Sequence, residues 1–285
     1  MDRIDLHAHT NRSDGSLEPA ALVALAKETG LRALAVTDHD TTSALAIARE
    51  VGRSLGVEIL TGAEITARFP GRSMHVLAYG FEDREPALCA MLAEIVAGRE
   101  TRNPRIVERL CELGAPVTMA EVRAEAKGDV IGRPHIAAAL VRRGHVADTK
   151  TAFSLFLRDG GPAYVAADRV DPEEVISTVR DAGGVTVLAH PKQLRVDAPA
   201  GYEALFGRLA AAGLSGIEVD HPSHRTDDRA LFGRLADAMG LVRTGGSDFH
   251  GASKPDVRLG SGDGSISVDY AVWEALRARC AASPA

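Results

Sequence analysis

The stretch Ile4-Asp5-Leu6-His7-Ala8-His9 opens the chain and decides its fold. It is a short apolar segment that ends in polar residues, and we predict the first strand of a sheet over residues 4–9. His7 and His9 are two residues apart, so on a strand both imidazoles project from the same face, where one metal ion can bind both. The start of the chain therefore predicts a strand that ends in a metal site.

Strand and helix patterns alternate along most of the remaining chain. Short apolar segments that end in polar residues are followed by helix-period segments with their own start and stop signals, such as Pro19 in a first turn and Gly30 just after an end. About seven strand–helix units favour the parallel α/β class. Further strands are predicted at residues 33–37, 57–60, 74–79, 185–188, 216–219 and 241–244, and helices at 19–29, 42–55, 171–183, 202–212, 227–239 and 269–281.

Consecutive helices without intervening strands replace this alternation from about residue 82. One of them begins at Thr118-Met119-Ala120-Glu121, which has the sequence of a capping box. We therefore predict a helical insertion at residues 99–165 that caps the substrate site, within a larger domain formed by residues 1–98 and 166–285. The helices of this region are predicted at residues 85–96 and 104–113 and from residues 118, 134 and 149 onward.

The composition is that of an ordered globular protein. The chain has 285 residues, 45% of them hydrophobic, and can bury a sizeable core. Its net charge of −6 excludes general attraction of its surface to long nucleic acids. Three widely spaced cysteines, Cys89, Cys111 and Cys280, fit neither a disulfide framework nor a thiolate zinc site. With no signal peptide and no membrane-length apolar run, we expect a cytoplasmic protein with no membrane contact.

Histidine and carboxylate residues recur where the predicted strands end. His39, Glu64 and His190 each close an apolar segment, and Asp248 and His250 repeat the two-residue spacing after the last strand. Because the carboxyl ends of parallel strands meet on one face of a barrel, we expect these side chains to lie close together. Asp14 and His75 complete the candidate set with His7 and His9. His75 begins a strand, so we expect a bend or an antiparallel strand there.

A single histidine at a strand end is more often a hydrogen-bonded structural residue than a metal ligand. Four such motifs in one domain favour the metal site, because structural histidines have no reason to gather in this way. We interpret His145 and His224 as structural, since they fall in helix or loop contexts. Mixed imidazole and carboxylate ligands suit Mn²⁺, Fe²⁺ or Zn²⁺. The candidate set contains no thiolates, so nothing in it selects zinc strongly.

An ordered set of motifs between residues 5 and 250 resembles the PHP (polymerase and histidinol phosphatase) family of metal-dependent, amidohydrolase-like phosphoesterases. These motifs are Asp5-Leu6-His7-Ala8-His9-Thr10, Ser13-Asp14-Gly15, Thr37-Asp38-His39-Asp40, Gly62-Ala63-Glu64, Ala189-His190-Pro191 and Gly246-Ser247-Asp248-Phe249-His250. The resemblance implies a distorted, TIM-like (β/α)7 barrel with two or three divalent ions, of which we expect Mn²⁺. It implies His7, His9, Glu64 and Asp248 around one ion, His75 and His190 with bridging Glu64 around a second, and Asp14, His39 and His250 around a third.

Hydrolysis of a phosphoester needs a nucleophile, a proton donor and neutralised phosphate oxygens. A water between two ions bridged by Glu64 becomes a hydroxide near neutral pH, with Asp248 as a further catalytic ligand. His221, at another strand end, is the candidate that protonates the leaving oxygen. For phosphate binding we predict Arg12, Arg133, His135 and Lys254, although an arginine near a helix start is as often a solvated surface charge.

The substrate prediction depends on Asp14. Histidinol phosphatases and polymerase-associated members of the family typically have His there, so Asp14 disfavours both. The Ser13-Asp14-Gly15 motif and the insertion resemble the branch with 3',5'-nucleotide bisphosphate phosphatases and a 5'-to-3' exoribonuclease of short RNA. We expect adenosine 3',5'-bisphosphate to be hydrolysed to AMP and phosphate, with the exoribonuclease as the alternative. Only 4% of residues are aromatic, which fits a mononucleotide or short RNA.

A non-catalytic metal-binding module is the remaining alternative. Loss of catalysis should leave ligand positions missing, and all nine are filled in this chain. The sequence gives no sign of an obligate protein partner. We therefore expect a phosphoric monoester hydrolase whose partner is a small nucleotide.

Overall fold

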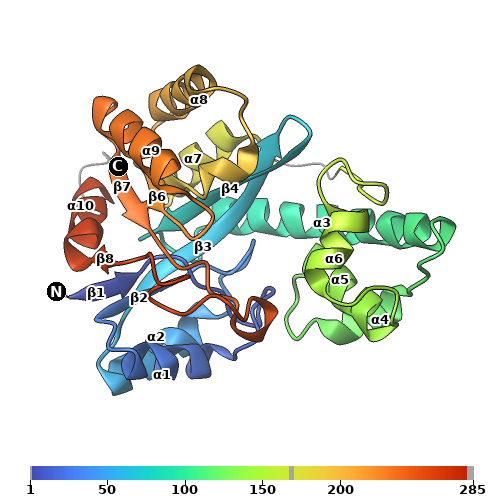
Figure 1. The fold of residues 1–285 in the computed structure, drawn as a ribbon. Coiled ribbons are helices and arrows are strands. Elements are labelled where there is room, and N and C mark those ends of the chain that lie inside the picture. Colours follow the sequence, from blue (N-terminus) through green and yellow to red (C-terminus); the bar gives the residue numbers. More distant parts are fainter. Residues whose placement is uncertain (1, 167–169, 281–285) are drawn as a thin grey trace.

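The computed structural model describes residues 2–166 and 170–280, and within them eight strands form one sheet (Figure 1). The sheet order is β7-β6-β5-β4-β3-β2-β1-β8. The strands are β1 (Arg3–Asp5), β2 (Ala33–Val36), β3 (Glu58–Phe69), β4 (Arg72–Tyr79), β5 (Val185–Leu188), β6 (Gly216–Asp220), β7 (Val242–Gly245) and β8 (Val268–Asp269).

Strand direction changes three times along this sheet. β1, β2 and β3 are parallel, as are β5, β6 and β7, whereas β4 is antiparallel to both β3 and β5. The antiparallel strand expected at His75 is therefore confirmed. The short β8, antiparallel to β1, was not predicted, because two residues carry no readable period.

The segments that follow β1 and β7 bring the two ends of the sheet together. Ala8 bridges Phe249 in parallel, the Asp248 N–H donates to the His7 carbonyl (2.9 Å), and the His9 N–H donates to the Phe249 carbonyl (2.9 Å). The sheet thus nearly closes, and the predicted distorted TIM-like barrel is confirmed. The first strand ends at Asp5, not at His9, because the backbone beyond it pairs with loop residues such as Thr37 and Phe249.

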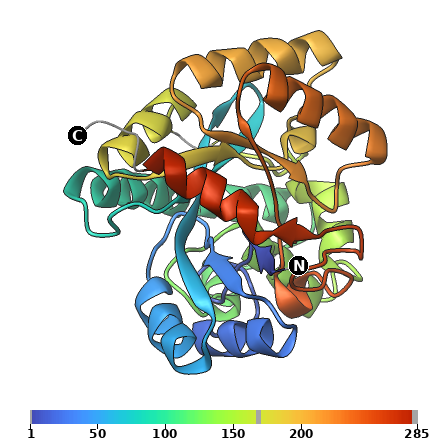
Figure 2. The ribbon, with the colours of Figure 1, turned by 90° about the vertical axis from the view of Figure 1, so that its left-hand side faces the viewer.

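Helices surround the barrel, as both ribbon views show (Figures 1 and 2). The N-terminal end of the barrel is filled by apolar residues from β1 to β5 together with Trp273 and Leu276 of the last helix. This packing leaves the opposite end, where the parallel strands terminate, for polar residues. The helices are α1 (Pro19–Glu28), α2 (Leu45–Leu55), α7 (Pro172–Asp181), α8 (Pro199–Ala211), α9 (Thr226–Ala238) and α10 (Tyr270–Cys280). The end expected for the last helix, residue 281, lies outside the described residues.

A long helix, α3 (Pro86–Glu112), joins the barrel to the helical region beside it (Figure 1). The sequence predicted two helices here, and that prediction is wrong, because α3 continues through Pro104. Contacts in its middle hold the backbone helical despite the lost N–H: Arg99 pairs with Asp40, and the Asn103 amide donates to the Ile131 carbonyl (2.9 Å).

The helical region has an apolar core of its own, which includes Ile106 and Leu110 of α3. The capping box at Thr118 is confirmed, since its hydroxyl accepts from the Glu121 N–H (3.2 Å). The predicted boundary between residues 98 and 99 falls inside α3, and the division into two domains stays a prediction. The helices are α4 (Met119–Glu125), α5 (Arg133–Arg142) and α6 (Thr149–Ala152), which continues as a π-helix (Phe153–Leu157). In residues 2–166 and 170–280 no helix is long and apolar enough to cross a bilayer.

Candidate metal centre

All nine predicted metal ligands gather at the C-terminal end of the barrel. They come from segments far apart in the chain, from the loop after β1 to the loop after β7, and are at most about a sixth exposed except for the partly buried His75. The nine residues are His7, His9, Asp14, His39, Glu64, His75, His190, Asp248 and His250.

The first group consists of His7, His9, Glu64 and Asp248. Both Nε2 atoms lie 3.2 Å from Glu64 Oε2, and they lie 3.5 Å (His7) and 3.4 Å (His9) from Asp248 Oδ1. Four ligands at about 2.0–2.2 Å from a tetrahedral ion are separated from one another by about 3.4 Å. The donor atoms of this group therefore have the spacing of a metal site.

Several imidazole nitrogens of the site lie buried without an aligned hydrogen bond to any described residue. They are His7 Nε2, both nitrogens of His9 and His39 Nδ1. Buried polar atoms almost always have a partner, so these unpartnered ring nitrogens indicate an external one. Together with the donor types, this observation shows that the residues present fit a divalent cation.

Glu64 presents its two oxygens to different histidines. Oε2 faces His7, His9 and His39, each at 3.2 Å. Oε1 lies 2.8 Å from His75 Nδ1 and 2.8 Å from His190 Nε2. A carboxylate with this orientation has the geometry of a bridge between two ions, which is the role predicted for Glu64.

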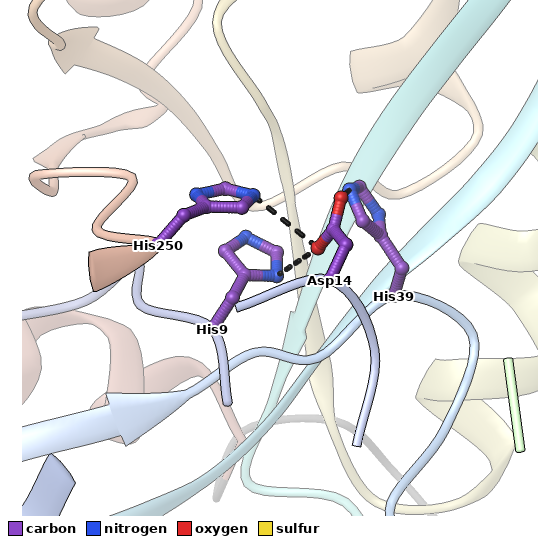
Figure 3. A group of neighbouring side chains, drawn as sticks. All are labelled: His9, Asp14, His39 and His250. Atoms are coloured by element: carbon purple, nitrogen blue, oxygen red, sulfur yellow. Dashed lines mark ion pairs between the residues drawn. The ribbon is translucent and has the colours of Figure 1, made fainter. Parts of the chain in front are cut away.

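Asp14 is the centre of the third group (Figure 3). Its Oδ1 lies 3.3 Å from His250 Nε2 and 3.8 Å from His9 Nδ1, and its Oδ2 lies 3.8 Å from His39 Nε2. His9 thus takes part in two groups, one through each ring nitrogen, whereas the motif resemblance assigns it only to the first. The four side chains converge from the loops after β1, β2 and β7.

Asp38 holds the loop that carries Asp14. Its carboxylate accepts hydrogen bonds from the Thr10 N–H (2.8 Å), the Thr10 hydroxyl (2.6 Å) and the Ser13 hydroxyl (2.6 Å). The loop also requires glycine at position 15, because a Cβ there would lie 2.4 Å from the His9 carbonyl oxygen. The Ser13-Asp14-Gly15 motif is thus built to hold one carboxylate in place.

The carboxylates of the site change the protonation of its histidines. Burial lowers the pKa of His7, but Glu218, Glu64 and Asp248 outweigh it and raise that pKa well above the ordinary value. The same balance raises the pKa of His9 to about 9. Burial lowers the pKa of His39 to about 3, so that imidazole is neutral. A metal cation competes with protons for the same imidazole lone pairs. Carboxylates that favour a bound proton therefore also favour a bound cation.

Backbone strain is concentrated in the same loops. His190 (φ +26°) and Asp248 (φ +54°) lie in the left-handed region, as does Asp40 (φ +53°), which follows His39 directly. Non-glycine residues adopt such angles only where the surroundings hold them. The Asp40 carboxylate is held by hydrogen bonds from the Thr66 N–H (2.7 Å) and from the charged Arg99 Nε (2.9 Å).

Asp248 also links two residues predicted to act on substrate. Its Oδ2 accepts from Lys254 Nζ (2.6 Å) and lies 3.3 Å from His221 Nε2. The Ser223 N–H donates to His221 Nδ1 (3.0 Å), so the proton of the neutral ring is on Nε2, toward Asp248. Burial lowers the pKa of His221, so the resting ring is neutral, and it must first be protonated to act as the predicted general acid.

Of the other three predicted phosphate-binding residues, two lie where the insertion meets the Asp14 loop and one lies within the insertion. His135, whose Nδ1 accepts from the Gly132 N–H (3.0 Å), lies near Asp14, and Arg12 is about one third exposed on the loop that carries Asp14. Arg133 instead pairs with Asp159 (2.7 Å) and donates to the Leu157 carbonyl (2.9 Å), within the insertion. Phosphate binding by these residues and by Lys254 stays a prediction.

Glu218 was missed by the sequence reasoning. It is fully buried on β6 and accepts from His7 Nδ1 (2.8 Å) and from the His190 N–H (2.7 Å). A signal was present, because a glutamate between Ile217 and Val219 in an apolar strand needs a buried partner. Arg99 was also missed, and nothing in the sequence connects it with Asp40.

Several known proteins are similar to this chain along most of its length. The PHP domain family matches residues 5–142. Over 98% of its length the chain is 33% identical to a 3',5'-nucleoside bisphosphate phosphatase of Chromobacterium violaceum, with 98% of that protein covered. The chain belongs to the PHP family. The resemblance drawn from its motifs is thereby confirmed.

Other relatives carry different names. A 5'-3' exoribonuclease of Haemophilus influenzae is 34% identical (87% of this chain, 90% of the relative), and a phosphoribosyl 1,2-cyclic phosphate 1,2-diphosphodiesterase of Eggerthella lenta is 36% identical (87% and 94%). A solved structure from Bifidobacterium adolescentis, assigned as a metal-dependent phosphoesterase, has a TM-score of 0.87 and 34% identity (97% and 96%). The PHP family and the cluster of ligands identify this chain as a metal-dependent phosphoesterase.

Proposed function

We propose that this protein hydrolyses the 3'-phosphate of nucleoside 3',5'-bisphosphates, such as adenosine 3',5'-bisphosphate, and releases AMP and phosphate. The observation that carries the proposal is the position of Asp14 among His9, His39 and His250, where a histidine is expected in enzymes of histidinol phosphate. The match to the bisphosphate phosphatase of C. violaceum also includes the insertion, since it covers 98% of both chains.

The site residues would divide the work between ion binding and substrate binding. His7, His9, Glu64 and Asp248, with the two neighbouring groups, would hold the divalent ions, for which we propose Mn²⁺. Bound ions neutralise phosphate charge and lower the pKa of water. Lys254, about two fifths exposed beside Asp248, would pair with a phosphate oxygen at the rim. His221, beside Asp248, would give a proton to the leaving 3'-oxygen when its ring is in the protonated, imidazolium form.

The insertion lies close enough to this site to contact the substrate. A Cβ on Gly128 would lie 2.2 Å from the Arg12 carbonyl oxygen, and His135 contacts the Ser13 backbone, so the insertion packs directly on the Asp14 loop. A cavity of about 350 Å³ lies between α3 and the loop after His39, with Leu92, Val96 and Val130 in its lining. We propose that the nucleoside enters this space while its 3'-phosphate faces the ions.

A 5'-to-3' exoribonuclease on short RNA is the second candidate. The relative from H. influenzae supports it over 87% of the chain. Both reactions take a nucleotide with a 5'-phosphate and cleave at the 3' ester, so the same ligands serve either. The acidic net charge of −6 favours the mononucleotide, because a longer strand needs a basic track.

Parallel assays of one protein preparation test these proposals. Mn²⁺-loaded protein is given adenosine 3',5'-bisphosphate, a short 5'-phosphorylated RNA, a phosphoribosyl 1,2-cyclic phosphate and histidinol phosphate, with Glu64→Gln as the inactive control. We expect the largest kcat/KM for the bisphosphate. Preference for histidinol phosphate or the cyclic ester would refute the proposal, and stepwise shortening of the RNA at a higher kcat/KM would establish the second candidate.

A further inference from the structure

Glu218 lies beneath the metal centre and contacts two of its ligands. It is in the middle of β6 and fully buried. One carboxylate oxygen accepts from His7 Nδ1 at 2.8 Å, and the other accepts from the His190 backbone N–H at 2.7 Å. His7 belongs to the first group of ligands, whereas His190 faces the opposite oxygen of Glu64. One buried carboxylate therefore connects the two sides of the proposed bridge.

The bond to His7 determines which nitrogen is available for metal. A carboxylate accepts but cannot donate, so the neutral His7 ring has its proton on Nδ1 and its lone pair on Nε2. That Nε2 atom is buried without an aligned hydrogen bond in the described part of the chain and faces Glu64 and Asp248. A carboxylate behind a ligating imidazole also makes the imidazole a stronger donor.

The bond to His190 holds a strained backbone. The φ of +26° at His190 lies outside the regions that a non-glycine residue normally adopts, and such strain costs about 1–3 kcal/mol. A charged hydrogen bond between its N–H and Glu218 offsets part of that cost. With the backbone fixed in this way, the His190 Nε2 atom lies 2.8 Å from Glu64 Oε1.

We propose that Glu218 is a positioning residue that aligns His7 and His190, and thereby sets the affinity of two ion sites through one side chain. The proposal rests on the metal centre described above and is independent of the substrate. A purely structural role is the alternative. It predicts lower stability when Glu218 is replaced, but unchanged ion binding in the folded protein.

Glu218→Gln tests the proposal, because the Gln side chain has the shape of Glu but only one oxygen that accepts hydrogen bonds. Either His7 Nδ1–H or the His190 N–H then faces an amide NH₂ in place of an acceptor. We expect Mn²⁺ affinity, measured by chelator competition, to fall about 10- to 100-fold, as for other residues that orient metal ligands. We also expect saturating Mn²⁺ to restore most of kcat, while KM for substrate stays near the wild-type value.

The matched control is Asp220→Asn, on the same strand, whose half-buried carboxylate lies 3.9 Å from Arg229 and contacts no predicted ligand. Thermal unfolding in chelator reports folding of each variant. If folded Glu218→Gln binds Mn²⁺ as tightly as Asp220→Asn, the proposal is overturned. If Glu218→Gln does not fold, Glu218→Asp, one methylene shorter, is measured in the same way, and unweakened binding again overturns it. Wild-type protein that binds no Mn²⁺ would instead refute the metal centre itself.

Discussion

Replacing Glu64 by Gln should remove most ion binding and most activity without changing the shape of the side chain. Glu64 is 1% exposed, and its oxygens lie 2.8–3.2 Å from five imidazoles. The amide of Gln keeps one oxygen and puts an NH₂ group where the other was. Both sets of histidines, that of His7 and His9 and that of His75 and His190, then lose the negative charge that they share, and one of the two sets faces the NH₂ group.

The size of the effect follows from the charge that is lost. Two unit charges about 4 Å apart interact by about 4 kcal/mol at an effective dielectric constant near 20. At 1.4 kcal/mol for each factor of ten, this corresponds to about a thousandfold weaker binding of an ion. We therefore expect kcat to fall by about two to three orders of magnitude at a fixed Mn²⁺ concentration, with at least one ion fewer per chain.

The assay combines elemental analysis of the purified variant with initial rates of phosphate release. Glu58→Gln is the control, because Glu58 lies on the same strand but contacts Tyr270 and Trp273 at the opposite end of the barrel. This control should keep its ions and its activity. Near-normal metal content and turnover in Glu64→Gln would show that Glu64 does not bridge two ions.

Four further outcomes test other parts of the structure. Asp38→Ala removes the acceptor of three buried hydrogen bonds on the Asp14 loop. It should lower the free energy of unfolding, measured by urea titration, by about 2–4 kcal/mol, and a loss below about 0.5 kcal/mol would contradict this. Arg99→Met leaves the Asp40 carboxylate unpaired and should cost about 2–4 kcal/mol, part of which Asp40→Asn should recover; no recovery would exclude a direct coupling. Mn²⁺ at about 100 times its Kd should stabilise the protein by about 2.7 kcal/mol over protein in chelator, visible in calorimetry, and no shift would contradict specific binding. Val96→Trp should fill the cavity beside α3 and raise KM for the nucleotide but not for p-nitrophenyl phosphate; equal effects on both would place the nucleoside elsewhere.

The sequence predicted most of the candidate site because barrel geometry brings strand ends together. His39, His190 and Asp248 each follow an apolar strand, and that position alone predicts their convergence. His75 was placed correctly as well, because a ligand at the start of a strand reaches the same end of the barrel only if that strand runs in the opposite direction. For these residues the information is local.

Features that depend on contacts between distant segments could not be predicted. Pro104 indicates a helix boundary, but α3 continues through it, since Arg99 and Asn103 bind the barrel and the insertion on either side. The position of Glu218 in an apolar strand signals a buried partner, but not that this partner is His7, 211 positions away. Hydrogen bonds of this kind are set by the tertiary structure and have no period in the sequence.

Closure of the barrel and assembly of the metal centre involve the same residues. The Asp5 carboxylate on β1 accepts from the Ser247 N–H (2.9 Å), and the Asp248 N–H donates to the His7 carbonyl (2.9 Å), so the first and last parallel strands meet between proposed ligands of one ion. An ion held by His7 and Asp248 would link the two edges that these hydrogen bonds join. Metal binding should therefore stabilise this closure more than the insertion, whose core is separate. In hydrogen exchange, Mn²⁺ should protect the backbone at residues 5–9 and 246–250 and leave α4 unchanged.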